Sequence, residues 1–265
     1  MIIHPSLGIS QALRAPVAAG YLKLGAYSLH HADLFSSLEN PAGLSSLRTF
    51  AAGVYGEKRY LLKELNNYSA MIGVPTSSGN FGLEAGYFGF RDFNETKLGL
   101  IYGRNLGEKL DVGAGFFYQG IQVAGYGNAA AIGFETGGLF HFNEQFHAGI
   151  KTMNIFGGKF GRSKEEKLSS VYSLGFGFEG SKKFFAGFEF EKEEDRPLNL
   201  NAGIQYKFLP FLQASLGLAS ATATGWTAIG LNWKNWRFDF ISSYHPYLGI
   251  SPGLLLLYQP LPKSQ

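Results

Sequence analysis

The chain has 265 residues and no cysteine, is rich in glycine (36), phenylalanine (24) and tyrosine (14), and carries charge on only 16% of its residues. The absence of cysteine excludes disulfides, thiolate metal sites and a cysteine nucleophile, and the small net charge of +3, spread over scattered Lys and Arg, disfavours nucleic-acid binding. No apolar run approaches the roughly 20 residues of a membrane-spanning helix, so a membrane location requires a closed β-barrel.

The first part of the chain, residues 1–47, shows no strand-like alternation. It reads as loop and short helix, with helical turns expected at 33–37 and 42–47. Residues 1–20 contain neither the basic nor the apolar region that is typical of an export signal. Because this stretch is too long to be an unattached terminal tail, we expect it to fold into the lumen of the barrel as a plug.

From Arg48 onward, short segments alternate apolar residues with small or polar ones, and each segment ends in a turn signal. Segment 198–208 is the clearest example, with an apolar face and a polar face. About fourteen such segments predict an all-β protein, an antiparallel transmembrane β-barrel over residues 48–260 with a short tail at 261–265. Turns are expected at Gly79–Asn80, Asn94–Glu95 and Asn143–Glu144. The longer loops are expected at 57–65 and 156–170.

The residues on the second face of these segments distinguish a membrane barrel from the alternative, which is a soluble β-sandwich or lipocalin-like barrel. That face consists mostly of Gly, Ala and Ser with isolated charges, which suits a crowded lumen better than a solvated surface. Aromatic residues near the segment ends predict interfacial girdles. They are Tyr55, Tyr102, Tyr118, Trp226, Trp233, Trp236 and Tyr244. The apolar face is therefore expected to contact lipid.

Isolated charges on the second face predict a lumen wall that binds the plug through paired charges and hydrogen bonds. The wall residues are Glu84, Lys97, Glu135, Lys151, Glu179, Lys207 and Arg237. The alternative is that these charges hydrate an open pore. If the plug is correct, its own residues and these wall residues form the candidate site.

A motif in the plug suggests a family. The stretch 25–47, GAYSLHHADLFSSLENPAGLSSL, directly precedes the first strand. It resembles the segment that carries the Asn-Pro-Ala motif in the FadL-like superfamily of long-chain fatty-acid transporters, and resembles still more the smaller PorV/PorQ-like proteins of Bacteroidota-type bacteria. The candidate plug residues are Asp33, Asn40, Pro41, Ala42 and Gly43.

The resemblance covers this stretch in sequence and most of the chain in architecture. It implies a fourteen-stranded barrel of the bacterial outer membrane with its N-terminus folded inward. Asn40 would cap the short helix that follows, and Pro41 would occupy the first helical position. The fatty-acid transporters build a capture groove from long extracellular loops, for which this chain has few residues left over.

Catalytic and metal chemistry is not indicated. His30 and His31 lie beside Asp33, but no third ligand is evident, and loop histidines on the surface are the simpler interpretation. His141 and His147 flank a predicted turn and could meet across the hairpin, yet nothing in the spacing selects a nucleophile. The acidic run 189–195 is interpreted as a solvated rim rather than a cation site. We therefore predict a non-enzyme without a cofactor or a metal.

Two functions from different classes fit these features. The first is an accessory or docking barrel that binds protein partners in an outer-membrane complex, such as a type IX secretion translocon or a barrel-assembly machine. The second is a FadL-like channel for apolar small molecules, with a lateral opening near Pro75 or at 120–127. The short loops favour the first function. Either way, the outer-membrane lipid is a partner.

Overall fold

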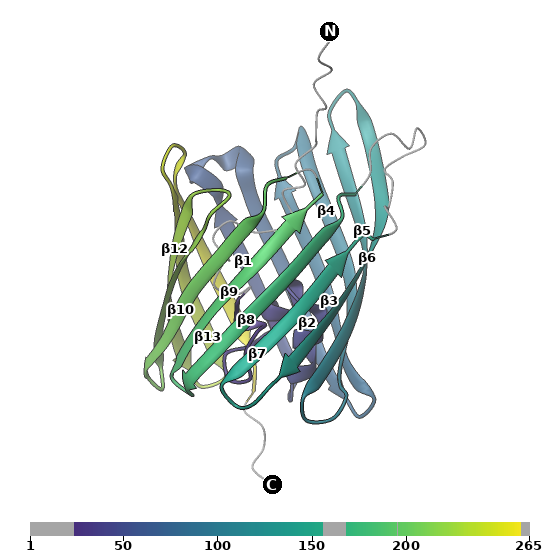
Figure 1. Ribbon diagram of the computed structural model, residues 1–265. Coiled ribbons are helices and arrows are strands. Elements are labelled where there is room, and N and C mark those ends of the chain that lie inside the picture. Colours follow the sequence, from purple (N-terminus) through teal and green to yellow (C-terminus); the bar gives the residue numbers. More distant parts are fainter. Residues whose placement is uncertain (1–23, 156–167, 195, 261–265) are drawn as a thin grey trace.

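The structure is a computed structural model and describes residues 24–155, 168–194 and 196–260. Fourteen β-strands in these residues close into a barrel, in which each strand pairs antiparallel with its sequence neighbours and β14 pairs with β1 (Figure 1). The strands are β1 Ala51–Lys58, β2 Asn66–Thr76, β3 Gly79–Gly89, β4 Phe93–Asn105, β5 Leu110–Val123, β6 Gly127–His141, β7 Phe146–Met153, β8 Val171–Ser181, β9 Phe184–Glu193, β10 Asn199–Leu209, β11 Leu212–Ala219, β12 Thr224–Trp233, β13 Trp236–His245 and β14 Gly249–Tyr258. The predicted all-β, antiparallel barrel is confirmed.

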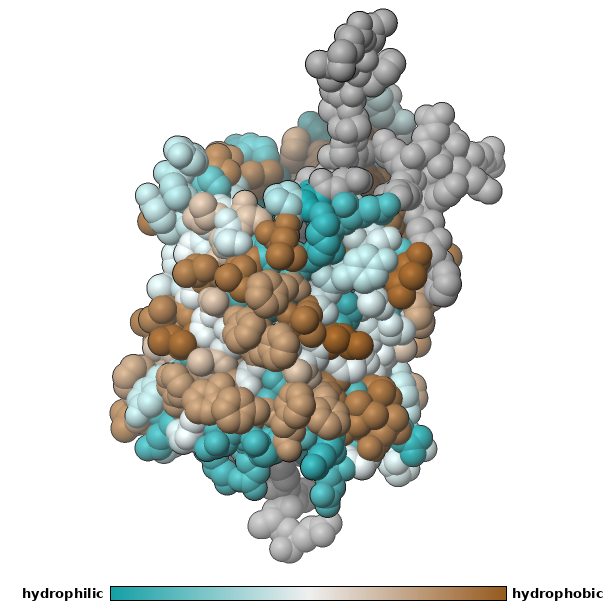
Figure 2. All heavy atoms as spheres, in the orientation of Figure 1, coloured by the Kyte–Doolittle hydropathy of each residue, from teal (hydrophilic) through white to brown (hydrophobic). Residues whose placement is uncertain are grey.

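Exposure alternates along the strands as the sequence pattern predicts. Outward side chains are large and apolar, and Leu98 on β4 and Ile150 on β7 each expose 60% of their surface. Their inward neighbours, such as Glu84 and Lys151, are buried. Figure 2 shows apolar side chains across the middle of one outer face, with hydrophilic side chains gathered at its lower end. A soluble sandwich would bury these groups, whereas a lipid-facing wall exposes them.

Two of the aromatic residues assigned to the girdles face the interior instead. Tyr55 on β1 is 3% exposed and donates a hydrogen bond to Glu57, and Trp226 on β12 is 5% exposed and covers Gly203 and Gly217. Each occupies an inward position of its strand, and this alternation, rather than closeness to a strand end, determines that the side chain faces the interior. Tyr118, Trp233, Trp236 and Tyr244 are exposed as predicted.

The strand connections correct two predicted turns. The chain reverses at 77–78 and at 90–92, so Gly79–Asn80 opens β3 and Asn94–Glu95 lies in β4. An Asn or Gly beside another polar residue is a common turn signal, but here Asn80 and Glu95 point inward and are buried. The turn at Asn143–Glu144 is confirmed. Two 3-10 helices, η5 Arg59–Leu61 and η6 Lys63–Leu65, form much of the predicted loop at 57–65.

Residues 24–47, the N-terminal segment, lie inside the barrel near the end at which β1 begins (Figure 1, purple). They contain two 3-10 helices, η3 Leu34–Leu38 and η4 Pro41–Ser46, close to the predicted helical turns. Their apolar side chains join inward residues of the wall in one core, which includes Leu44, Met71 and Ile101. Among the described residues, no helix has the length and apolar character needed to cross a bilayer. Three predicted parts of the chain lie outside the described residues: the remainder of the plug at 1–23, the rest of the second loop at 156–167 and the tail at 261–265.

Candidate functional site

The Asn40–Gly43 motif is fitted against β6 and β7. The Asn40 side chain caps η4 by accepting a hydrogen bond from the Ala42 N–H at 3.0 Å, and its amide donates to the carbonyl oxygen of Ile150 at 3.0 Å. Pro41 takes the first helical position, as the resemblance implies. A Cβ atom at Gly137 would overlap the Asn40 side chain. The motif therefore shapes a short helix and fastens it to the wall at the same time.

Asp33 has a similar double role at the start of η3. Its carboxylate accepts from the Ser36 N–H at 3.0 Å, which completes a capping box, and it forms an ion pair with Arg237 on β13. The Arg237 Nε atom also donates to Asp239 at 2.9 Å. This arrangement ties the helix start to the wall through a guanidinium held between two carboxylates.

Three more of the predicted wall charges bind the N-terminal segment. The Lys151 Nζ atom lies 3.3 Å from a carboxylate oxygen of Glu39. Lys207 donates to the carbonyl oxygen of His30 at 2.8 Å. Glu179 accepts from the backbone N–H groups of Leu29 and His30 and lies 2.7 Å from His30 Nδ1. The predicted contact between wall charges and this segment is thus present at Lys151, Glu179, Lys207 and Arg237.

The remaining wall residues form a separate group. Lys97 and Glu84 pair with each other at 2.9 Å, and the Lys97 ammonium sits 4.8 Å from the centre of the Phe117 ring. Glu135 is buried on β6, two positions along from the glycine that contacts Asn40. Lys97 and Glu84 thus pair with each other rather than with the motif.

Several residues in the contact between the wall and the N-terminal segment were not predicted from the sequence. Tyr27 is fully buried and donates to Glu189 at 2.6 Å, while its ring covers inward glycines of β7 and β8. Glu189 is completely buried, so its assignment to a solvated rim is wrong. The Asn80 amide donates to the carbonyl oxygens of Leu44 and Leu47 at 2.8 and 2.9 Å. Single polar residues of this kind carry no spacing signal, because their partners come from distant parts of the chain.

The acidic residues Glu39, Glu189 and Glu191 form a compact cluster in the lumen, with one oxygen from each within 4.8 Å of the others. Glu189 also accepts from Asn201 at 3.1 Å, and Glu39 is paired with Lys151. The hydrogen bond from Tyr27 adds to these contacts. The cluster is therefore part of the polar contact between the N-terminal segment and β9.

The histidines divide into two groups. His141 and His147 meet across their hairpin, as the sequence allowed, with Nδ1 atoms 2.9 Å apart. His31 is only 7% exposed and stacks on Phe185, so the interpretation as a surface histidine is wrong. Burial lowers the pKa of His31 to about 4. The imidazole is therefore neutral at pH 7.

A second apolar cluster lines the interior beyond the N-terminal segment. Inward side chains of β5 to β8 and of the chain just before β8 make up this cluster, here called the upper apolar patch: Phe117, Ile121, Ala131, Met153, Leu168 and Val171. Phe93, Val123 and Ala129 pack against it. The sequence pattern predicted a wall of glycine and charge, and these inward apolar residues are the exception to it.

Strand pairing beside the upper apolar patch is incomplete. β6 pairs with β7 only from Glu135 to His141, because β7 ends at Met153. Among the described residues, Gly127–Gly133 of β6 has no strand partner on that side, whereas Phe134 exchanges hydrogen bonds with Asn154. By contrast, Pro75 and Gly120, which lie in the two regions suggested for an opening, are each paired within a ladder.

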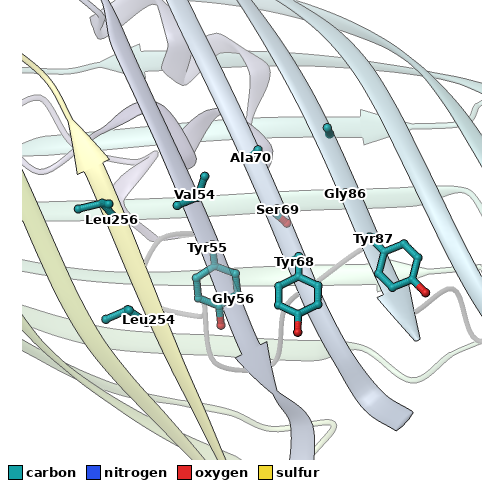
Figure 3. Close-up of a pocket in the computed structure, with 11 residues that line it drawn as sticks. Val54, Tyr55, Gly56, Tyr68, Ser69, Ala70, Gly86, Tyr87, Leu254 and Leu256 are labelled. Carbon is teal, nitrogen blue, oxygen red and sulfur yellow. The ribbon is translucent and has the colours of Figure 1, made fainter. Parts of the chain in front are cut away.

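The outer wall of the barrel carries apolar grooves where small residues lie between large ones. One groove of about 560 Å³ spans β14, β1, β2 and β3, with Gly56, Ala70 and Ala85 among its lining residues. Tyr68 and Tyr87 border it with their hydroxyl groups toward the same end (Figure 3). The ladders beneath this groove are continuous.

No protein-family model and no curated protein matches the sequence. Several solved structures share the fold. A Pseudomonas aeruginosa FadL homologue has a TM-score of 0.67 at 10% identity, with 91% of this chain and 96% of that chain covered. The Pseudomonas putida toluene transporter TodX has a TM-score of 0.59 at 11% identity, covering 92% and 96% of the two chains. The CymD monoaromatic hydrocarbon channel has a TM-score of 0.62 at 11% identity, covering 86% and 93%. The chain therefore has the barrel fold of these channels.

Proposed function

We propose that this protein is a non-enzymatic channel of the bacterial outer membrane that admits apolar small molecules, and that it belongs to the FadL-like superfamily. The observation that carries the proposal is the upper apolar patch inside the barrel. A water-filled pore keeps a polar interior, whereas the inward side chains Phe117, Ile121 and Met153 pack together here in a buried apolar cluster. An interior that is apolar at these positions favours an apolar solute over a hydrated one.

The location follows from the outer wall. Its exposed apolar side chains require hydrocarbon around them, and a closed ladder satisfies the backbone groups there. The fold is that of channels described as hydrocarbon or toluene transporters. This likeness supports apolar small molecules as the substrate class and lipid as the surrounding partner.

We propose that the solute leaves the barrel through its side wall. Residues 24–47 fill the interior at the end at which β1 begins, and we propose that they act as a plug there. A solute on the upper apolar patch lies next to the edge of β6 at Gly127–Gly133. Passage over the end of β7 would deliver it to the lipid without moving the plug.

A docking role in a secretion or assembly complex remains the second candidate. The short connections at 90–92 and 124–126, which lie at the same end of the barrel, support it, because transporters of the fatty-acid type have long capture loops. Membership of the PorV/PorQ-like group is part of that candidate.

Uptake by whole cells tests the channel. The protein would be expressed in the outer membrane of a host, and uptake of radiolabelled toluene would be measured against a hydrophilic sugar of similar size. Burial of one large apolar side chain is worth about 1.5–3 kcal/mol, so Ile121→Asn should lower toluene uptake by roughly tenfold or more. Ile121→Leu, the matched control, should retain it.

Two results would contradict the proposal. One is toluene uptake that Ile121→Asn leaves unchanged while the barrel is folded and present at equal amounts. The other is copurification of the native protein with subunits of a secretion machine together with no selectivity for toluene over the sugar. The second result would favour the docking role.

A further inference from the structure

β7 ends at a residue whose side chain continues the bonding that the strand gives up. The ladder between β6 and β7 stops at the pair Glu135 and Met153, and the next residue, Asn154, adopts a left-handed backbone with a φ of +58°. Asparagine enters this region more readily than most residues, because its short polar side chain can bond locally. The backbone therefore turns out of the sheet at Asn154, although the residue itself stays buried at 3% exposure.

Asn154 hydrogen-bonds to the chain on both sides of β7. Toward β6, its N–H donates to the Phe134 carbonyl oxygen at 2.8 Å, and its Oδ1 atom accepts from the Phe134 N–H at 3.3 Å. Toward β8, its Nδ2 atom donates to the Ser169 carbonyl oxygen at 3.3 Å, and its own carbonyl oxygen accepts from the Ser170 hydroxyl at 3.0 Å. One residue thus bonds to β6 and to the chain that leads into β8, as a further residue of β7 would have done.

The Asn154 side chain also borders the upper apolar patch. Gly133 is the inward neighbour of Phe134 on β6, and a Cβ atom added there would overlap both the Phe117 ring and the Asn154 Oδ1 atom. The aromatic ring and the amide therefore meet over the backbone of β6, at the point where its pairing with β7 stops. A solute that rests on the patch would lie next to this amide.

We propose that Asn154 forms the edge of the side exit and limits the size of the apolar solute that leaves there; this inference rests on the proposed channel and its proposed route. On one side of Asn154, the ladder from Glu135 to His141 is closed. On the other side, Gly127–Gly133 of β6 has no strand partner toward β7 among the described residues. A closed ladder blocks passage, because opening it would leave backbone groups unpaired in lipid. The exit therefore begins at the last bonded residue, which is Asn154.

The hydrogen bonds of Asn154 also suit an apolar solute. An unpaired N–H beside such a solute costs free energy, since neither the solute nor the lipid tails can accept from it. The Asn154 amide pairs the Phe134 N–H on one side and the Ser169 carbonyl oxygen on the other. The edge of the exit thus consists of paired polar groups and the Phe117 ring, so an apolar solute can pass without breaking a hydrogen bond.

Two substitutions separate this role from the ending of β7. Ending the strand needs only a left-handed backbone, which glycine adopts at no steric cost. Asn154→Gly keeps that conformation and both backbone bonds but removes both side-chain bonds. Asn154→Asp keeps an acceptor for the Phe134 N–H and loses the donor to Ser169. Asn128→Gly, at an exposed position in the same stretch of β6, is the matched control.

Hydrogen exchange of the folded protein in detergent micelles tests the contact. The Phe134 amide should exchange about tenfold or more faster in Asn154→Gly than in the wild type, because its side-chain partner is gone. Asn128→Gly should leave the Phe134 rate unchanged. An unchanged rate in a folded Asn154→Gly barrel would overturn the proposal. This measurement does not depend on transport.

Uptake of a small and a large apolar solute by whole cells tests the size limit. The ratio of pyrene to toluene uptake should rise by about tenfold in Asn154→Gly, rise severalfold in Asn154→Asp, and keep its wild-type value in Asn128→Gly. Heat-dependent migration on gels shows whether each barrel is folded, and Asn154→Asp decides if Asn154→Gly is not.

The failure of this inference differs from the failure of the channel. A wild-type uptake ratio in a folded Asn154 variant, while toluene is still preferred over the hydrophilic sugar, would overturn the role of Asn154 alone. Absence of that preference in the wild-type protein would overturn the channel, and the size limit with it.

Discussion

Tyr27 lies against a part of the inner wall that has glycine where other parts have side chains. Gly149 on β7 and Gly175 on β8 leave the space that its ring fills, and Gly177 on β8 admits its backbone carbonyl. Its hydroxyl reaches Glu189 on the next strand. A larger side chain at these positions would have kept the ring away. These inward glycines therefore allow the N-terminal segment to contact the backbone of the strands directly.

Gly175→Ala should loosen this contact. The new Cβ atom would overlap the Tyr27 ring, so the ring must move and its hydrogen bond to Glu189 is lost. A hydrogen bond to a charged group contributes about 1.5–3 kcal/mol, and we expect a comparable loss in docking of the segment. Faster chymotrypsin cleavage after Tyr27 would report it. Gly138→Ala, where the nearest atom is 3.8 Å from the new Cβ, is the control, and equal protection in both variants would contradict the prediction.

His31 makes docking of the segment depend on pH. Burial, followed by the nearby Lys207 charge, lowers its pKa to about 4, while Glu179 acts in the opposite direction. A released segment would regain the ordinary value near 6.5. Because the docked pKa is the lower one, docking is strongest above pH 6.5 and weakens as the pH falls toward 4, by up to about 3 kcal/mol.

Protease protection as a function of pH checks this dependence. The wild-type protein should lose protection between pH 6.5 and 4, and His31→Phe, which keeps a ring beside Phe185, should lose less. Identical profiles for the two proteins would show that His31 is not the responsible group.

The elements inside the barrel are short 3-10 helices that depend on caps and on the wall. η3 and η4 are each too short to be stable alone. Asp33 and Asn40 begin them, and both residues also bind the wall. The Asn-Pro pair predicted the helix start, because a cap is a local signal. The wall contact could not be predicted, since the Ile150 carbonyl oxygen is 110 positions away in the chain.

Asn40→Asp separates the two tasks of this residue. A carboxylate can still accept from the Ala42 N–H, but it cannot donate to the Ile150 carbonyl oxygen and would repel it. We expect the loss of docking to be about 1–3 kcal/mol, larger than for Asn40→Ser, which retains a cap and a donor. Hydrogen exchange of the Ala42 and Gly43 amides measures it. A greater loss in Asn40→Ser would refute the assignment.

At the scale of the whole molecule, the barrel could be predicted and its contents only in part. Alternation at period two shows which face meets lipid, and repeated turns give the strand number, since both are local properties. Inward charges such as Glu179 and Arg237 could be placed on the wall, but not paired. The upper apolar patch was missed because Phe117 and Ile121 break the pattern at single positions and gain meaning only when β7 and β8 bring Met153 and Val171 beside them.

Lys207→Glu tests whether the N-terminal segment closes the barrel. Lys207 donates to the His30 carbonyl oxygen near Glu179, so a carboxylate in its place would repel both acceptors and loosen the segment. Liposomes that contain the variant should swell severalfold faster in a small sugar than those with the wild-type protein. Lys182→Glu, in the exposed β8–β9 turn, makes the same charge change away from the segment. If both variants swell like the wild type with folded barrels, the docked segment does not limit the passage of water-soluble molecules.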